Sequence, residues 1–126
     1  MNLKALKFAF SVVQYPSHAD IPDWAIRADW ISITRTDEEL SIVCPTEELE
    51  QEGLILQVEH DWCALKIEGP LAFELVGILE SITKPLAEHQ ISIYALSTYN
   101  TDYVLIKKAQ LEKAIEVLQE KGHQFV

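Results

Sequence analysis

The sequence is poor in glycine and cysteine, and it contains no long hydrophobic run. Its four glycines are scattered, which excludes a glycine-rich phosphate-binding loop. The two cysteines, Cys44 and Cys63, have neither the spacing of a metal site nor that of a disulfide framework. Both lie in apolar, strand-like stretches, so we expect buried free thiols in a reducing cytoplasm. No apolar stretch approaches the roughly 20 residues that cross a bilayer, and the first residues lack the features of a secretory signal.

Positive charge is also scarce. Lysine and arginine together number 10 against 20 aspartates and glutamates, which gives a net charge of −10 at pH 7. Such a surface repels phosphate groups, so nucleic acids and membranes are not expected as partners. The hydrophobic content of 48% is enough for a packed core, and 126 residues fit one domain or two small halves that share a core.

Residues with catalytic potential are few and dispersed. The four histidines, His18, His60, His89 and His123, are far apart, and no pair has the spacing of metal ligands on a helix. No serine or cysteine occupies a nucleophile elbow. We therefore expect no catalytic residue, no metal, no cofactor and a protein that is not an enzyme.

A polar stretch separates two apolar runs late in the chain; its sequence is Ser97-Thr98-Tyr99-Asn100-Thr101-Asp102. The flanking residues 91–96 and 103–106 are rich in β-branched and aromatic side chains, so the pattern predicts a hairpin with a polar tip. Asp102 has hydroxyl-bearing neighbours and no basic residue before Lys107. Turn chemistry alone explains these residues, so a solvated turn competes here with a binding site.

The second half of the sequence predicts a β-α-β-β-α-β order, the ferredoxin-like arrangement. Pro70 suits the first turn of its first helix, and Pro85 is expected to end or kink that helix. We assign residues 62–126 to one complete half. Its predicted elements are strand 62–68, helix 71–84, the two strands of the hairpin, helix 109–121 and strand 123–126.

The first half resembles a degenerate repeat of the second, and we assign it residues 1–61. Most of its first helix is missing, and the fold class is therefore α+β with two ferredoxin-like halves. Thr36-Asp37 echoes Thr101-Asp102, although chance similarity between two hairpins competes with a true repeat. The predicted elements are strand 3–14, one helical turn at 23–26, a hairpin of 30–36 and 40–44, a short helix capped by Thr46, and strand 54–59.

The ferredoxin-like order brings two polar features of the second half to one edge of its sheet. The junction at Gly69-Pro70 offers unpaired N–H groups at a helix N-terminus, which attract anions. The tip at residues 98–102 offers a carboxylate and hydroxyls. A free α-amino acid carries a carboxylate beside an ammonium group, so its two ends match these two features.

Three runs of sequence resemble a known family: residues 30–44, 66–71 and 96–105. They are similar to the tandem ACT-domain proteins related to the CASTOR arginine sensors and to small prokaryotic ACT-domain, aspartokinase-like regulatory proteins. The resemblance implies two ACT-like halves and a regulatory module that binds an amino acid between ACT units without chemistry of its own. It also implies a homodimer, because relatives with four such units in one chain would be matched by two copies of this one.

The expected ligand-binding residues are Gly69, Pro70, Leu71, Ser97, Thr98, Tyr99, Asn100 and Asp102. In this hypothesis Asp102 neutralises the ligand ammonium, Ser97 and Thr98 add hydrogen bonds, and the amides after Gly69 take the carboxylate. The net charge of −10 favours a basic amino acid such as arginine or lysine. The alternative is a ligand-free oligomerisation or scaffold module.

Overall fold

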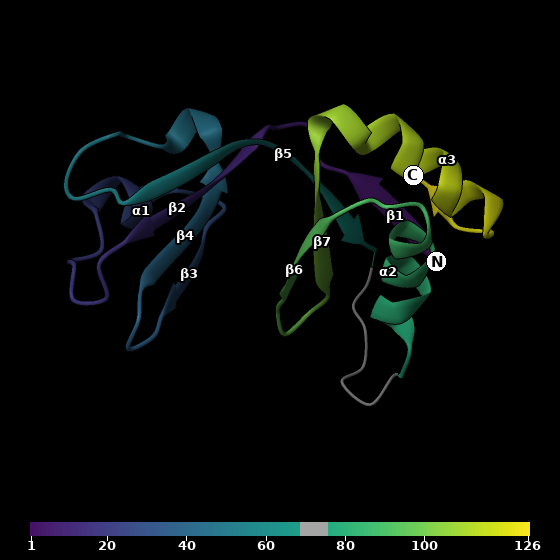
Figure 1. Cartoon of the computed structure of the whole chain (residues 1–126), viewed down its shortest axis with the longest axis horizontal. Helices are drawn as coiled ribbons and strands as arrows, with labels where there is room; N and C mark the ends of the chain where they lie inside the picture. Colours follow the sequence, from purple (N-terminus) through teal and green to yellow (C-terminus); the bar gives the residue numbers. More distant parts are fainter. Residues whose placement is uncertain (69–75) are drawn as a thin grey trace. The chain divides into compact units, whose positions relative to one another are not determined.

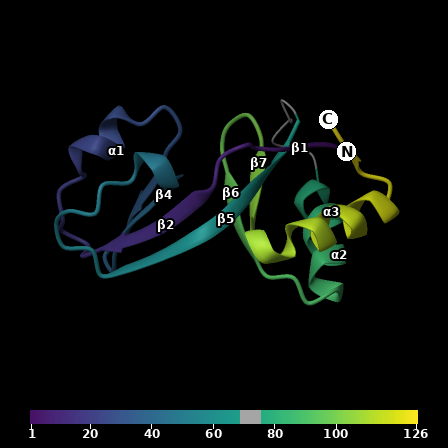
Figure 2. The ribbon, with the colours of Figure 1, turned by 90° about the horizontal axis from the view of Figure 1, so that it is seen from above.

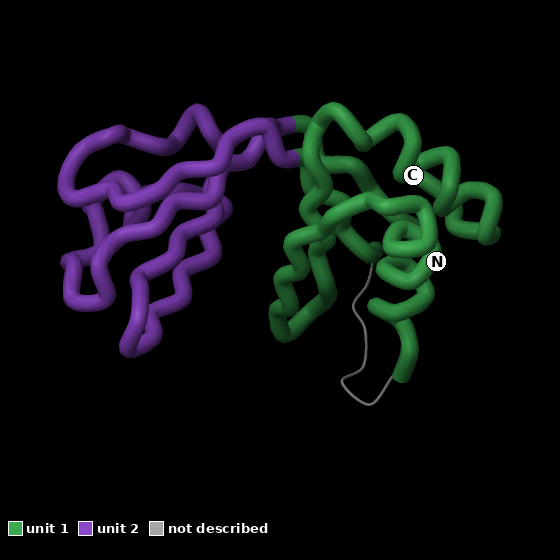
Figure 3. Tube along the Cα trace, in the orientation of Figure 1, with its two compact units in different colours: residues 1–7, 63–126 green, residues 8–62 purple. Residues whose placement is uncertain are grey.

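The computed structural model describes residues 1–68 and 76–126. The chain forms two compact units: unit 1 comprises residues 1–7 and 63–126, and unit 2 comprises residues 8–62 (Figure 3). Each unit has its own hydrophobic core. Within the described ranges, no helix is long and apolar enough to cross a membrane.

Unit 1 has the predicted ferredoxin-like order with one extra strand, β1, inserted in its sheet. β1 lies between β5 and β8, antiparallel to β5 and parallel to β8, while β7 pairs with β5 and β6 on the other side. The elements are β1 (Asn2–Ala5), the later part of β5 (Gln57–Ile67), α2 (Ile78–Glu88), β6 (Ile93–Ser97), β7 (Asp102–Lys107), α3 (Leu111–Glu120) and β8 (Gln124–Phe125).

The two helices of unit 1 lie next to each other and pack on its strands (Figures 1 and 2). Ile82 and Leu86, four residues apart, put one face of α2 into the core, and Ala114 and Leu118 do the same for α3. All four side chains are almost fully buried against strand residues such as Ile67. This core holds the end of β5 and the start of β7 in place.

Pro85 does not end α2, because the helix continues to Glu88. Proline has no N–H to donate to the carbonyl of Ser81, four residues earlier. That carbonyl instead accepts a hydrogen bond from Nε2 of His123 at 3.0 Å. A side chain that follows α3 therefore satisfies the acceptor that Pro85 leaves open in α2.

Unit 2 repeats the ferredoxin-like plan with both helices reduced. The strand order is β3-β4-β2-β5, and all neighbours are antiparallel. Its first helix has only five residues, so the predicted loss of most of that helix is confirmed. The elements are β2 (Phe10–Tyr15), α1 (Asp23–Arg27), β3 (Ser32–Arg35), β4 (Leu40–Pro45), the 3-10 turn η1 (Thr46–Glu48) and the first part of β5.

Three expectations for the first half are wrong. The single strand over 3–14 is two strands, because β1 pairs within unit 1 and β2 within unit 2, and the chain changes partners between them. The helix expected from Thr46 is a 3-10 turn, and the Thr46 hydroxyl bonds to Ser11 Oγ instead of capping it. The strands expected over 54–59 and 62–68 are one strand, β5.

β5 contains an irregularity at the point where the sequence analysis expected a break. Asp61 has a φ of 65°, and the register with β2 shifts between Phe10 and Val12. An extra residue of this kind is a β-bulge, which bends a strand without ending it. The polar residues His60 and Asp61, which interrupt the apolar pattern, are therefore compatible with one continuous strand.

Candidate ligand-binding hairpin

The turn between β6 and β7 is closed by the two threonines at its ends. Ser97 pairs with Asp102, which leaves residues 98–101 as the turn. The Thr98 N–H donates to the Thr101 carbonyl at 2.8 Å, and the Thr98 hydroxyl donates to the same oxygen at 3.1 Å. The Thr98 oxygen also accepts the Thr101 N–H at 3.3 Å. The only hydroxyl proton of Thr98 is thus used by the turn, and its oxygen keeps acceptor capacity.

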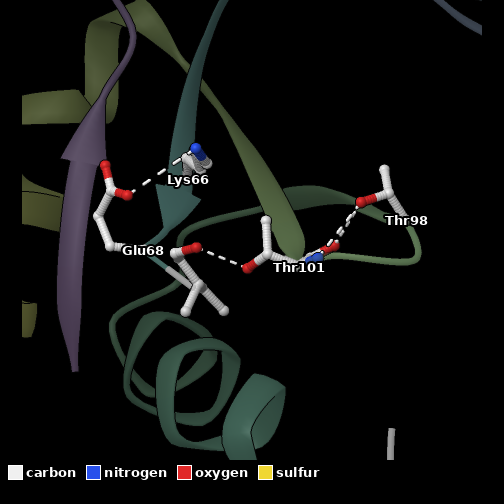
Figure 4. Close-up of polar contacts among 5 residues, drawn as sticks. Lys66, Glu68, Thr98 and Thr101 are labelled. Carbon is white, nitrogen blue, oxygen red and sulfur yellow. Dashed lines mark hydrogen bonds and ion pairs between the residues drawn. The ribbon is translucent and has the colours of Figure 1, made fainter. Parts of the chain in front are cut away.

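Thr101 ties this turn to the end of β5 (Figure 4). Its hydroxyl donates to the carbonyl of Ile67 at 2.5 Å, and Thr101 is only 4% exposed. The contact lies two residues before Gly69. Sequence reasoning did not include Thr101 among the site residues. The signal available was only that Thr101 alternates with the buried Leu105 of β7, whereas Val104 and Ile106, which belong to the core of unit 1, lie on the other face.

The remaining predicted residues of the hairpin are accessible. Ser97, Thr98 and Asn100 are exposed, and Tyr99 is 79% exposed. Asp102 is half-buried at the start of β7, and no ion pair to it is seen among residues 1–68 and 76–126. The predicted residues Gly69, Pro70 and Leu71, and the predicted helix start at Leu71, lie outside the described residues.

Figure 4 also shows one ion pair, which lies at the end of β5 close to the hairpin. Lys66 Nζ lies 3.8 Å from a carboxylate oxygen of Glu68, and both side chains are about one-third exposed. Glu68 therefore offsets the positive charge of Lys66 close to the hairpin. A partly exposed pair of this kind contributes little to stability, so its main consequence is that the two charges offset each other.

The hairpin of unit 2 has the same turn length, but an apolar residue follows its turn. Arg35 pairs with Leu40, so residues 36–39 form the turn, and the Thr36 oxygen accepts the N–H groups of Glu38 and Glu39 at 3.1 and 3.2 Å. Thr36 thus corresponds to Thr98, and the alignment of Thr36-Asp37 with Thr101-Asp102 is wrong. The residue that corresponds to Asp102 is the buried Leu40, so this hairpin has no carboxylate there.

Within the described part of the chain, no group of three or more histidine, cysteine, aspartate or glutamate side chains could hold a metal ion. His60 Nδ1 lies 2.7 Å from Ser11 Oγ, but Ser11 is fully buried and cannot meet a substrate. Both cysteines are free thiols. Burial, with a smaller contribution from Glu48, raises the pKa of the Cys44 thiol to about 12, so its reactive thiolate is rare at neutral pH.

The fold of unit 1 is ferredoxin-like, and a family model described as the ACT domain matches residues 57–120. The chain belongs to the ACT-domain family, which confirms the resemblance seen in the sequence. A second family model, for an N-terminal domain, matches residues 9–52.

Curated relatives include the cytosolic arginine sensor for mTORC1 subunit 1. This chain is 31% identical over 100 residues to the Bos taurus protein and 29% identical over 103 residues to the Homo sapiens protein. The matches cover 73% and 75% of this chain but 30% and 31% of the two relatives. The chain therefore spans less than a third of the length of these relatives.

Solved structures show the same architecture. A protein from Agrobacterium tumefaciens has a TM-score of 0.89 at 35% identity, with 99% of this chain and 91% of that chain covered. The aspartokinase alpha and beta subunits give a TM-score of 0.65 at 20% identity, with 96% and 97% covered. The regulatory subunit of aspartate kinase from Thermus thermophilus gives 0.61 at 12% identity, with 93% and 96% covered. The aspartokinase similarities establish the fold alone.

Proposed function

We propose that this chain is a non-catalytic regulatory module of the cytoplasm that binds a free amino acid at the β6–β7 hairpin. The observation that carries the proposal is the hydrogen bond from Thr101 to the Ile67 carbonyl, which fixes the turn beside the end of β5. Membership of the ACT-domain family supports a regulatory role. The similarity to proteins named as cytosolic arginine sensors supports an amino acid as the ligand.

The proposed contacts follow from the hydrogen-bonding capacity of each group. Asp102 pairs with the ligand ammonium, and the Thr98 oxygen accepts a second ammonium proton because its own proton is already used in the turn. The Ser97 hydroxyl is exposed and adds a further bond. Capture of the ligand carboxylate by the amides that follow Gly69 stays a prediction, since those residues lie outside the described part of the chain.

We propose a basic amino acid, with arginine ahead of lysine. The net charge of −10 attracts a cationic ligand, and relatives named as arginine sensors point the same way. The ligand is held between the hairpin and a second ACT unit, which a second copy of the chain supplies in a homodimer. A dimer would also bring the assembly closer in size to the longer relatives.

The test is a thermal-shift screen of the chain against the twenty amino acids. A ligand at 100 times its Kd stabilises the folded state by about 2.7 kcal/mol, which is a shift of several degrees for a domain of this size. We expect the largest shift with arginine. Absence of a shift with every amino acid would favour the alternative, a ligand-free oligomerisation module. A larger shift with aspartate or glutamate would overturn the choice of a basic ligand.

A further inference from the structure

The negative charge of this chain belongs to unit 2. That unit holds 12 of the 20 acidic residues but only two of the 10 basic ones, Arg27 and Arg35. Its net charge is therefore −10, and unit 1, which contains all of the lysines, is neutral. A charge of this size on one small unit attracts positively charged partners to that unit.

Both arginines of unit 2 are engaged within the unit. The Arg35 guanidinium donates to the carbonyl of Ser17 and, at 2.8 Å, to the carbonyl of Ala19. These bonds hold the loop between β2 and α1, which lowers the cost of ordering it when a partner binds. Arg27, at the end of α1, lies 3.9 Å from a carboxylate oxygen of Glu50, so α1 lies beside the segment that precedes β5.

Large apolar side chains are exposed where that segment meets α1. Leu54 is 68% exposed and, together with Ala19 and Pro22, lines a cavity of about 490 Å3. Ile26 is 69% exposed and lies one helical turn beyond Pro22, whose carbonyl accepts the Ile26 N–H at 3.3 Å. The apolar surface thus continues from the cavity onto α1. Exposed apolar surface with a polar rim marks interaction sites.

Carboxylates form the rim of this apolar surface. Asp20 and Glu52 line the cavity, and its lining includes neither lysine nor arginine. Asp23, the first residue of α1, is exposed next to them in the chain. An apolar centre with a charged rim is the common anatomy of a protein–protein interface. This rim repels phosphate-bearing partners, and it equally repels unit 2 of a second copy.

We propose that this surface of unit 2 binds a segment of another protein that is rich in lysine and arginine and carries a large apolar side chain. The apolar side chain enters the cavity against Pro22 and Leu54, and the next part of the segment covers Ile26. The basic side chains pair with Asp20 and Glu52. A small cation is too short to cover both Leu54 and Ile26, so the occupant is a polypeptide. The surface shares no residue with the β6–β7 hairpin and is independent of amino-acid binding there.

The experiment titrates the full chain with capped peptides and follows its backbone amide signals by NMR. The probe peptide has a central leucine flanked by lysines. Serine replaces the leucine in one control peptide, and glutamate replaces the lysines in the other. We expect the probe to shift the signals of residues 19–27 and 50–54. Because burial of a leucine side chain corresponds to about tenfold or more in affinity, the serine peptide should bind at least that much more weakly.

The glutamate peptide should leave all signals unchanged. Equal affinity for the probe and either control peptide would overturn the proposal, because the apolar anchor or the basic charge would then play no part. Shifts from the probe that scatter over the whole acidic surface would overturn it as well.

Variants of the chain assign the binding to the apolar centre. Ile26→Ser combined with Leu54→Ser removes both exposed apolar side chains and should weaken binding of the probe about tenfold or more. The matched control is Val126→Ser in unit 1, which removes a side chain that is 68% exposed and should leave the affinity unchanged. Unchanged affinity in the double variant, with its melting temperature retained, would refute the site.

The carboxylate rim is tested separately. Asp20→Asn combined with Glu52→Gln should weaken binding of the probe by up to about fivefold for each carboxylate removed. Asp37→Asn, in the turn between β3 and β4, is the matched control and should have no effect. If Asp37→Asn weakened the probe as much as the double variant does, the attraction would be a general effect of the charge of unit 2, and the proposed rim would be wrong.

Discussion

Thr101 is the residue on which the geometry of the hairpin depends. Its hydroxyl satisfies the Ile67 carbonyl in a buried environment. Thr101→Val keeps the shape but leaves that carbonyl without its partner, which costs about 1–3 kcal/mol. We expect a loss of that size in the free energy of unfolding, measured with urea. Ser97→Ala, at an exposed position of the same hairpin, should change it by less than about 0.5 kcal/mol. Equal effects of the two substitutions would show that Thr101 is only a turn residue.

Asp102 carries the proposed recognition of the ligand ammonium. Asp102→Asn removes the charge but keeps the size, and the loss of one partner of a partly desolvated pair costs on the order of 2–5 kcal/mol. Affinity for arginine, measured by calorimetry, should fall about thirtyfold or more. The melting temperature should stay close to that of the wild type, because Asp102 is not part of the core.

The control for Asp102 is Asp37→Asn, which removes the same charge from the exposed turn of unit 2. Asp37 is not the structural counterpart of Asp102, since Leu40 occupies that position, so this variant tests the general effect of charge alone. Arginine affinity should be nearly unchanged. If Asp102→Asn retained its affinity for arginine, the hairpin would be a structural turn and not a ligand-binding site.

Among the elements, α2 depends on a contact from outside itself. The Ser81 carbonyl, which Pro85 leaves without a donor, is satisfied by His123. His123→Phe keeps an aromatic ring but removes the donor, and we expect a loss of about 1 kcal/mol in unfolding free energy. In a Pro85→Ala background, residue 85 has a backbone N–H that can donate to the Ser81 carbonyl. His123→Phe should therefore lower the unfolding free energy by less in that background.

A urea-unfolding series of the wild type, the two single variants and the double variant measures this coupling directly. Residues that share one hydrogen-bonding partner show interaction energies of about 0.5–3 kcal/mol. We expect a value in that range. If His123→Phe costs the same in both backgrounds, the histidine acts through packing and does not replace the missing helix donor.

The elements also show where sequence reasoning succeeds and where it stops. Hydrophobic spacing predicted α3 and both hairpins, because each pattern reflects local geometry alone. Alternation over residues 3–14 predicted a strand but could not show that its two ends pair in different units. The expectation that Pro85 could end the helix failed for the same reason, since the donor that bonds to the Ser81 carbonyl in place of the missing proline N–H lies 38 positions away at His123. Tertiary partners, not local propensities, decided both cases.

For the candidate site, too, the sequence predicted the features that depend on element order and composition but not those that depend on tertiary contacts. The order of elements was enough to predict that the hairpin and the end of β5 lie together, which the Thr101–Ile67 bond shows. The turn residues were predicted as candidates from composition, but Thr101 was missed because a buried hydroxyl and an exposed one look alike in sequence. The alignment of the two hairpins failed because strand register, which fixes the correspondence, cannot be inferred from a two-residue echo.

At the scale of the whole molecule, the open sheet edges argue for self-association. Within the described residues, β6 pairs only with β7, and β3 pairs only with β4, so each leaves one side of its backbone without a strand partner. Exposed edges of this kind are templates for pairing with another chain. We predict a homodimer at tens of micromolar, and light scattering should give twice the 14.3 kDa mass of one chain.

Edge variants identify which strand pairs in that dimer. Ala95 is an exposed residue of β6, and Ala95→Glu places like charges opposite each other if two copies of β6 meet in an antiparallel arrangement. Light scattering should then give the mass of a single chain, while Thr34→Glu on β3 should leave the dimer intact. The reverse result would show that β3 forms the interface, and a dimer that persists in both variants would indicate contact through helices.

A wild-type monomer at tens of micromolar would contradict self-association. It would also contradict the proposal that a second copy of the chain completes the amino-acid site.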